Sequence, residues 1–277
     1  MQSESSETRD VARLVAAGIR AYVAPRVPVA FGLVGVLAVW IGLAGIMSPD
    51  VVPGPQAVIT RAIQMAHEPY ISATLQGHVA ISMARVLAGF LLGCTAGIML
   101  GLLKQFVPPT RGVLDSLLSL LLPLPPFTLI AVFIVWFGLG ETPKIALIFF
   151  GVFARMAIYV AAALQSLPPE LYDAGRSLGA SGLKMFFFIR VPTALPDLFI
   201  GMRILMAIAW TSVMGAELIA AKQGIGFAIW AAAGNLQTDV IFVGILTIST
   251  LGCLSDAALY LTGEKLTGGW ASRVREA

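Results

Sequence analysis

The chain has 277 residues, of which 58% are hydrophobic and 12% are charged, and its formal net charge is +3. Soluble domains usually carry about twice this share of charged residues, so the composition excludes an ordinary soluble domain. The apolar residues fall into runs of about 20, a length that crosses a hydrocarbon core of roughly 30 Å as a helix. Strands of a membrane barrel would alternate in polarity and would be about half as long. The chain is therefore predicted to be an all-α, polytopic transmembrane helical bundle.

About six membrane spans are expected, in line with a mean hydropathy of +0.88. Their approximate bounds are 27–47, 81–103, 117–139, 145–164, 198–218 and 240–261. The first 26 residues are polar and contain no apolar stretch that resembles a cleavable signal. The first span is therefore expected to be retained as an anchor.

The distribution of lysine and arginine predicts the orientation. These residues are more frequent on the side that holds both termini, which marks that side as cytoplasmic and places the segment 166–196 inside the cell. The inner residues are Arg9, Arg13, Arg20, Arg26, Lys104, Arg111, Arg176, Lys184, Arg190, Lys265, Arg273 and Arg275, and the outer ones are Arg61, Arg85, Lys144 and Lys222. The net charge is thus a topology signal. No nucleic-acid partner is expected, because no basic patch with interleaved aromatic residues occurs.

The first outer segment, 48–80, opens with a proline-rich turn that ends the first span. Apolar residues then recur at helical spacing over 58–66, with polar residues opposite them. This pattern predicts an amphipathic helix on the outer surface. The helix could form a lid or a contact for an external protein, or it could only seal the bundle.

The second span contains Gly93, Gly97 and Gly101, each four residues apart. This spacing removes the side chains from one helix face and lets another helix approach closely. The sequence does not decide whether that helix belongs to the same subunit or to a second copy.

The third span carries prolines at 123, 125 and 126 and ends beside Trp136. Proline breaks the hydrogen-bond ladder of a helix, and broken helices often line a solute pathway. Pro125 and Trp136 are therefore candidates for such a pathway. The alternative is a simple entry turn at the membrane surface.

The inner loop 166–196 is predicted to form two short helices at an angle. Glu170 suits a helix start, where negative charge meets the positive end of the helix dipole, and Gly179 suits a left-handed helix end. Ser181 can cap a second helix, which we expect to stop before Pro192. Three consecutive aromatic residues, Phe186–Phe188, need cover from the bundle or from a partner.

The spacing within this loop resembles a known motif. It runs Asp173-Ala174-Gly175, three residues, Gly179, nine residues, Ile189, one residue, Val191-Pro192. This resembles the EAA loop of bacterial binding-protein-dependent importer permeases, which is Glu-Ala-Ala, three residues, Gly, nine residues, Ile, one residue, Leu-Pro. Every spacing is kept, but the residue types at 173, 175 and 191 depart from the pattern. The resemblance implies that the loop fits a groove on an ATPase subunit through Glu170, Asp173, Ala174, Gly175, Gly179, Ala180, Ser181, Ile189 and Pro192.

The resemblance extends over about 48–270 and is nearest to the taurine, aliphatic-sulfonate and nitrate branch of these permeases, with taurine permeases the most similar. The similar passages are 124–126, 135–142, 179–181, 215–221, 224–227 and 238–240. They imply a type I ABC importer (MetI-like) permease fold. The implied organisation is a cytoplasmic segment 1–26, one permease domain 27–264 with its external loop 48–80 and its coupling loop 166–196, and a cytoplasmic tail 265–277.

This branch implies a bacterial inner membrane protein that works as a homodimer with two ATPase subunits and an external solute-binding protein. ATP and Mg would be held by the ATPase, so no cofactor or metal is expected in this chain. The implied function is to pass a small organic anion, such as taurine or an alkanesulfonate, into the cytoplasm. Nitrate or another small solute is an alternative within the same class.

Two ionisable residues, Arg155 and Glu217, fall inside predicted spans, where charge is costly and usually faces a partner or a watery cavity. Arg155 is expected about 15 Å deep, facing the passage between two copies and attracting an anionic solute. An internal ion pair is the alternative. Glu217 lies nearer the outer surface and either gates the passage or forms hydrogen bonds between helices. Arg203 and Asp197 are expected to snorkel to the interface.

Two other classes are weighed against the importer. An intramembrane enzyme has little support, because the 2 histidines, His67 and His78, lie on the outer side and form no metal motif, and no phosphate-binding loop occurs. A standalone channel or carrier would also use broken helices and isolated charges, although the spans show no internal repeat. The coupling loop discriminates, because a carrier needs no motor.

Overall fold

The computed structural model describes residues 26–267, and these residues are almost entirely helical. The helices are α2 (Arg26–Ile46), α3 (Pro55–His67), α4 (Leu75–Phe106), η1 (Pro108–Thr110), α5 (Arg111–Leu121), η2 (Pro126–Leu129), α6 (Ile130–Phe137), α7 (Thr142–Gln165), α8 (Pro169–Ser177), α9 (Gly182–Met185), η3 (Phe186–Arg190), α10 (Val191–Ala220), α11 (Ile225–Gly234) and α12 (Thr238–Leu266). The predicted all-α class is confirmed. The predicted segment 1–26 and tail 265–277 lie mostly outside the described residues.

The chain divides into two compact units, Met1–Thr60 and Arg61–Ala277. In the first unit, α2 forms the predicted first span, and its described apolar side chains are mostly exposed, as a lipid-facing helix requires. The indole of Trp40 donates a hydrogen bond of 3.0 Å to the carbonyl of Pro53. This bond ties α2 to the proline-rich turn that follows it. The predicted helix over 58–66 is found as α3, which crosses the boundary between the units.

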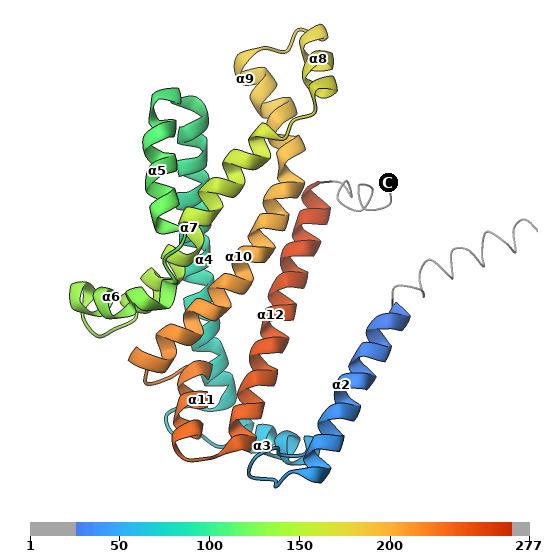
Figure 1. Ribbon diagram of the computed structural model, residues 1–277, viewed down its shortest axis with the longest axis vertical. Coiled ribbons are helices and arrows are strands. Elements are labelled where there is room, and N and C mark those ends of the chain that lie inside the picture. Colours follow the sequence, from blue (N-terminus) through green and yellow to red (C-terminus); the bar gives the residue numbers. More distant parts are fainter. Residues whose placement is uncertain (1–25, 268–277) are drawn as a thin grey trace, which may run out of the picture. The chain divides into compact units, whose positions relative to one another are not determined.

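The second unit is a bundle in which α4 and α10 both pack against α7, and α12 packs against α10 (Figure 1). The glycine face of α4 lies against α7. The glycines are Gly89, Gly93, Gly97 and Gly101, and the residues that face them are Ile148, Val152, Met156 and Val160. The question left open by the sequence is therefore answered, because the close partner of this face belongs to the same subunit.

Four helical segments of the described chain are long and apolar enough to cross a membrane: α4, α7, Gly182–Ile219 and α12. A fifth is counted if the bent pair formed by α5 and Pro126–Phe137 is one span. Among the described residues, four or five of the about six predicted spans are therefore found; the apolar part of α2, Phe31–Ile46, covers the first predicted span but is too short to be counted.

The predicted third span is not one helix. Its two parts, α5 and Pro126–Phe137, are bent by 88° relative to each other. The break falls at Pro125, which has extended backbone angles (φ −64°, ψ 124°). Since proline has no N–H and keeps the residue before it from helical geometry, the prolines at 123, 125 and 126 turn the chain instead of only kinking it. As a result, α6 projects sideways from the bundle (Figure 1).

The second helix of the coupling loop does not stop before Pro192, which corrects the sequence prediction. Instead, α9 continues through the π-helical turn η3 into α10, so that Gly182–Ile219 is one segment of 38 residues. The N–H of Val191 donates to the carbonyl of Phe186, five residues earlier. Pro192 follows directly, so the residue without an N–H stands where the hydrogen-bond ladder changes from the π-helical turn to α10.

Substitution of Gly97 by alanine should destabilise the protein. An added Cβ would lie 2.5 Å from the Cβ of Met156 and 2.6 Å from the carbonyl oxygen of Phe153, neither of which can move without shifting α7. We expect Gly97→Ala to lower the free energy of unfolding by about 1–3 kcal/mol. Thermal unfolding of the purified protein in detergent measures this change.

The matched control is Gly252→Ala on α12, where an added Cβ meets nothing within 4 Å. Because alanine favours a helix over glycine by up to about 1 kcal/mol, this control should be neutral or stabilising. Equal effects of the two substitutions would contradict the close α4–α7 contact.

Candidate functional site

The coupling loop is closed by a glycine turn at the end of α8. Gly179 has φ +80°, the left-handed region that favours glycine. The N–H of Ala180 donates to the carbonyl of Gly175 at 2.9 Å, and that of Gly179 donates to the carbonyl of Arg176 at 2.9 Å. These two bonds form a Schellman motif, which stops a helix and redirects the chain. The predicted helix end at Gly179 is confirmed.

Two positions of the motif, Gly175 and Ile189, meet inside the loop beside Met185. Gly175 is buried, and a Cβ placed there would overlap the Cδ1 of Ile189 and approach the Cε of Met185 at 3.1 Å. The close approach explains why glycine fits where the pattern has alanine.

Ser181 precedes α9 with extended backbone angles, but its side chain makes no capping hydrogen bond, so the predicted cap is wrong.

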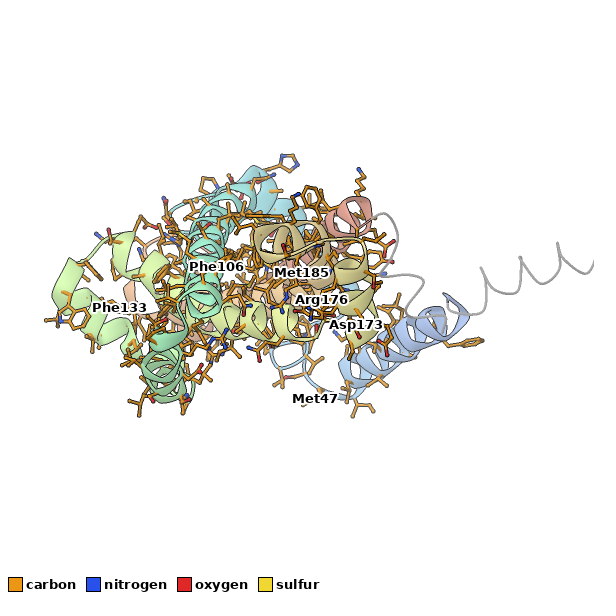
Figure 2. All side chains as sticks on the ribbon, turned by 90° about the horizontal axis from the view of Figure 1, so that it is seen from above. Met47, Phe106, Phe133, Asp173, Arg176 and Met185 are labelled. Atoms are coloured by element: carbon orange, nitrogen blue, oxygen red, sulfur yellow. The ribbon has the colours of Figure 1, made fainter. Side chains whose placement is uncertain are left out.

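The outer face of the loop combines charged and apolar side chains. Glu170, Asp173 and Ala174 are exposed, while Ala180 is half-buried. Figure 2 looks onto this end of the bundle and shows Asp173 and Arg176 there, near Met185. The exposed apolar residues include Leu178, at 88%, and Phe188, at 78%. Such a surface on a polar loop is typical of a protein contact.

The three aromatic residues of η3 divide between two surroundings. Phe186 is buried and packs edge-on against Phe106 of α4, with ring centroids 4.7 Å apart. Phe187 and Phe188 are exposed. The sequence predicted cover for this aromatic run from the bundle or from a partner. The bundle covers the ring of Phe186 and leaves those of Phe187 and Phe188 exposed.

Arg155 lies near the middle of α7, about 20 Å along a helix of about 36 Å. Its guanidinium donates to the carbonyl of Gly151 at 3.0 Å and to that of Leu122 at 3.1 Å. Leu122 ends α5, so Arg155 places a positive charge at a helix C-terminus, where free carbonyls favour cations. No carboxylate within 26–267 forms an ion pair with Arg155.

Pro125 and Trp136 lie on the same broken span as this carbonyl. Pro125 is exposed at the break, and Trp136 is 68% exposed on α6. Arg155 donates a hydrogen bond to the carbonyl of Leu122, on the α5 side of the break. Pro125 and Trp136 follow Leu122 in the chain. Arg155 and Pro125 thus lie at the helix break, whereas Trp136 lies at the far end of α6.

Glu217 lies apart from them, at the C-terminal end of α10, and is fully buried, at 0% exposure. Its carboxylate accepts hydrogen bonds from the Arg85 guanidinium at 2.7 Å and from the Ser82 hydroxyl at 2.8 Å, both on α4. It also accepts one from the N–H of Gly226 on α11 at 2.8 Å. Glu217 thus forms hydrogen bonds between helices, which was one of the two roles predicted for it from the sequence.

The same arginine extends the network towards the surface. Arg85 donates to the Glu141 carboxylate at 2.8 Å and to the carbonyl of Gln223 at 2.7 Å. Lys144 also donates to Glu141, at 2.9 Å. Hydrogen bonding from the Arg85 guanidinium is the main reason that the pKa of Glu141 falls to about 2. Two buried cations are thereby matched by two carboxylates.

A buried histidine completes this network. The N–H of Gly224 donates to Nδ1 of His78 at 3.0 Å, so the proton of the neutral ring is on Nε2, which donates to the carbonyl of Tyr70 at 3.1 Å. Gly224 has φ +125°, and a Cβ there would overlap the Glu217 carboxylate. Only glycine meets both conditions.

Most of this network was not predicted, and Arg85 and Lys144 were interpreted from the sequence only as topology signals. The available signal was the spacing of His78, Ser82 and Arg85, four and three residues apart, which places polar side chains on one face of an apolar helix.

Arg203 has an ion-pair partner that the sequence did not predict. It forms a two-pronged ion pair with Asp256 of α12, with both N–O distances at 2.7 Å, and lies over the ring of Tyr260. A carboxylate on the neighbouring helix is a nearer partner than water. Within 26–267, no group of three or more His, Cys, Asp or Glu residues could hold a metal ion.

Comparisons with known proteins agree with this architecture. Residues 89–267 match the family model described as binding-protein-dependent transport system inner membrane component. The chain is 34% identical over 234 residues to the taurine transport system permease protein TauC of Escherichia coli (strain K12), covering 83% of this chain and 85% of that protein. It is 32% identical over 233 residues to the aliphatic sulfonates transport permease protein SsuC of Bacillus subtilis (strain 168), covering 83% of each.

Among solved structures, the chain resembles the crystal structure of an amino acid ABC transporter with histidines. The TM-score is 0.52 at 16% identity, over 78% of this chain and 96% of that one. At this identity the likeness bears on the fold alone, and it supports the predicted MetI-like fold.

The lowered pKa of Glu141 predicts how stability depends on acid. As the pH falls below about 4.5, the ordinary pKa, the unfolded chain takes up a proton, whereas the folded chain does so only near a pH of about 2. The unfolding temperature of the wild type should therefore drop between these pH values more than that of Glu141→Gln. Unfolding curves in detergent at pH 5, 4 and 3 measure the difference.

Glu170→Gln, at an exposed carboxylate of the coupling loop, is the charge-matched control and should follow the wild type. Parallel curves for wild type and Glu141→Gln would contradict the role of Arg85 in holding the Glu141 carboxylate.

Proposed function

The chain belongs to the family of binding-protein-dependent transport system inner membrane components and is a multi-pass permease subunit; from this premise we propose that it imports taurine or a related alkanesulfonate. The observation that carries the proposal is the glycine turn of the coupling loop, which keeps the family's spacing and presents an exposed, partly apolar surface. The solute class is supported by similarity to a taurine and to an aliphatic-sulfonate permease.

The proposed assembly contains two copies of this chain, two ATPase subunits and an external solute-binding protein. ATP and Mg are held by the ATPase, and this chain carries no cofactor. Leu178 and Phe188, exposed beside Asp173, support an ATPase contact at the coupling loop. This contact would lie in the cytoplasm, together with both termini.

The motion of the ATPase reaches the membrane through α9, η3 and α10. Because Gly182–Ile219 is one segment, a displacement of the coupling loop is transmitted over about 57 Å to the end that holds Glu217. ATP binding would bring the paired loops together and open the bundle outward, and hydrolysis would reset it. A nucleotide can drive this change only by binding the two states unequally.

We assign the solute pathway to Pro125, Trp136 and Arg155, with Glu217 at its outer end. Arg155 supplies a positive charge at mid-membrane that no described carboxylate cancels, which suits a sulfonate. The exposed faces of Pro125 and Trp136 would be covered by the second copy. The buried Glu217 would act by holding α4, α10 and α11 together at the closed outer end.

Gly179→Val should uncouple import from ATP. A β-branched residue in the left-handed region costs about 1–2 kcal/mol, so the turn that orients α8 against α9 would change. In proteoliposomes that contain the ATPase and the binding protein encoded beside this chain, we expect saturable ATP-dependent uptake of taurine or an alkanesulfonate. The variant should lose this uptake about tenfold while still inserting.

Gly112→Val is the control, since a Cβ at Gly112 meets nothing within 4 Å. Full uptake by Gly179→Val would contradict the coupling assignment. Uptake of nitrate instead of sulfonates would contradict the proposed solute but not the importer function. Uptake without any ATPase would favour a standalone carrier.

Arg155→Gln should weaken uptake of an anionic substrate. Glutamine can still donate to one carbonyl, but it removes the positive charge, so the KM for an alkanesulfonate should rise about tenfold or more. Arg155→Lys, which keeps the charge, should retain most of the affinity. Unchanged KM and maximal rate in Arg155→Gln would exclude this residue from the pathway.

A further inference from the structure

A groove of three adjoining cavities lies where the connection between α4 and α5 meets the coupling loop. Their volumes are about 420, 660 and 410 Å³, and Gln105 lines all three. The two larger ones share Arg111, and the last two share Arg190. The groove is therefore continuous along its lining residues and is assembled from segments far apart in the sequence.

The middle cavity, of about 660 Å³, is lined by two arginines that are far apart in the sequence, Arg111 and Arg190. Arg190 stacks over the ring of Tyr172 at 5.9 Å, and within 26–267 no hydrogen bond or ion pair engages its guanidinium. The Nε of Arg111 donates a hydrogen bond to the carbonyl of Lys104 at 2.7 Å, and its Nη2 donates to Gln105. Its Nη1 has no described partner. Two guanidinium groups with unused donors suit an anion with several oxygens.

Acidic residues do not cancel this charge. In the neighbouring cavity, Asp115 is paired with Lys104. The middle cavity is lined by one acidic residue, Asp173, and by two arginines, Arg111 and Arg190, so positive charges outnumber negative ones. The groove thus keeps an excess of positive charge.

The third cavity is apolar along much of its wall. It is lined by Phe106, Leu183, Met185 and Phe186 in addition to Tyr172 and Arg190. Figure 2 shows Phe106 and Met185 near each other at this end of the bundle. An oxyanion site that continues into an apolar channel matches a molecule with a charged head and a hydrocarbon tail.

The groove also lies at the depth of a membrane surface. Gln105 and Phe106 end the apolar run of α4, and Arg190 directly precedes the apolar run of α10. Basic residues at the ends of spans lie at the level of lipid head groups. A free anion would need no apolar channel, so the position and the lining together favour a lipid.

We propose that this groove binds an anionic phospholipid, with its phosphate between Arg111 and Arg190 and an acyl chain along Phe106, Leu183 and Phe186. That the lipid comes from the cytoplasmic leaflet rests on the proposed function. The bound lipid joins the α4–α5 connection to the coupling loop, so it holds α8 and α9 in position against the bundle. The permease subunit then senses the charge of the surrounding membrane.

Native mass spectrometry of the purified full chain, incubated with phosphatidylglycerol or phosphatidylcholine, tests the proposal without an ATPase. Wild type should retain phosphatidylglycerol preferentially. Arg190→Gln, which breaks no described hydrogen bond, should weaken that retention about fivefold, and the double variant with Arg111→Gln should weaken it further. Arg176→Gln is the control, because this exposed arginine of the same loop lines none of the three cavities.

Equal retention of the two lipids, or equal retention by wild type and Arg190→Gln, would overturn the proposal. Displacement of phosphatidylglycerol by millimolar inorganic phosphate or taurine would also overturn it, because the site would then take its oxyanion from solution. Since no ATPase or transport is measured, a failure here leaves the importer function untouched, and a failure of uptake leaves the lipid site untouched.

Discussion

The buried carboxylate of Glu217 is the constraint on which the end of the bundle beside α11 depends. A charge inside a membrane protein is tolerated only when polar groups of the protein replace water, and here they come from α4 and α11. Removing one partner of such a pair costs about 3–5 kcal/mol, because the other is left buried and uncompensated. The ends of these helices, and Gly224 between them, are therefore fixed together.

The opposite end of the bundle is organised differently. The coupling loop is held by a glycine turn, the close packing of Ile189 on Gly175 and one covered ring, Phe186, while much of its surface is exposed. The long segment Gly182–Ile219 joins the two ends without a break in the chain. One end is thus held by buried charge pairs and the other by packing alone, a division that suits the transmission of motion proposed for this helix.

The sequence predicted the fold class, the order of the spans and the helix end at Gly179, because these depend on local composition and on backbone geometry. It did not predict that η3 would carry the chain through Pro192, since a glycine turn followed by a proline is equally compatible with a helix that stops. The prolines at 123, 125 and 126 predicted a broken helix or an entry turn, but not the angle of 88° between its two parts. The Arg85–Glu217 contact joins residues 132 positions apart, and no pattern within one helix reveals such a partner. The spacing of His78, Ser82 and Arg85 marks a polar face but does not say what covers it.

The way Arg155 is held has an electrical consequence. Its donors go to the carbonyls of Gly151 and Leu122, which orient the guanidinium but do not neutralise it. In the proposed pathway, a subunit without solute would carry this positive charge within the bundle, and a bound alkanesulfonate would cancel it. Voltage acts on one elementary charge moved across the whole membrane with about 2.3 kcal/mol per 100 mV. If Arg155 changes its depth between the two states of the proposed cycle, the membrane potential would act on the empty subunit more than on the loaded one, and the return step would be the voltage-sensitive part.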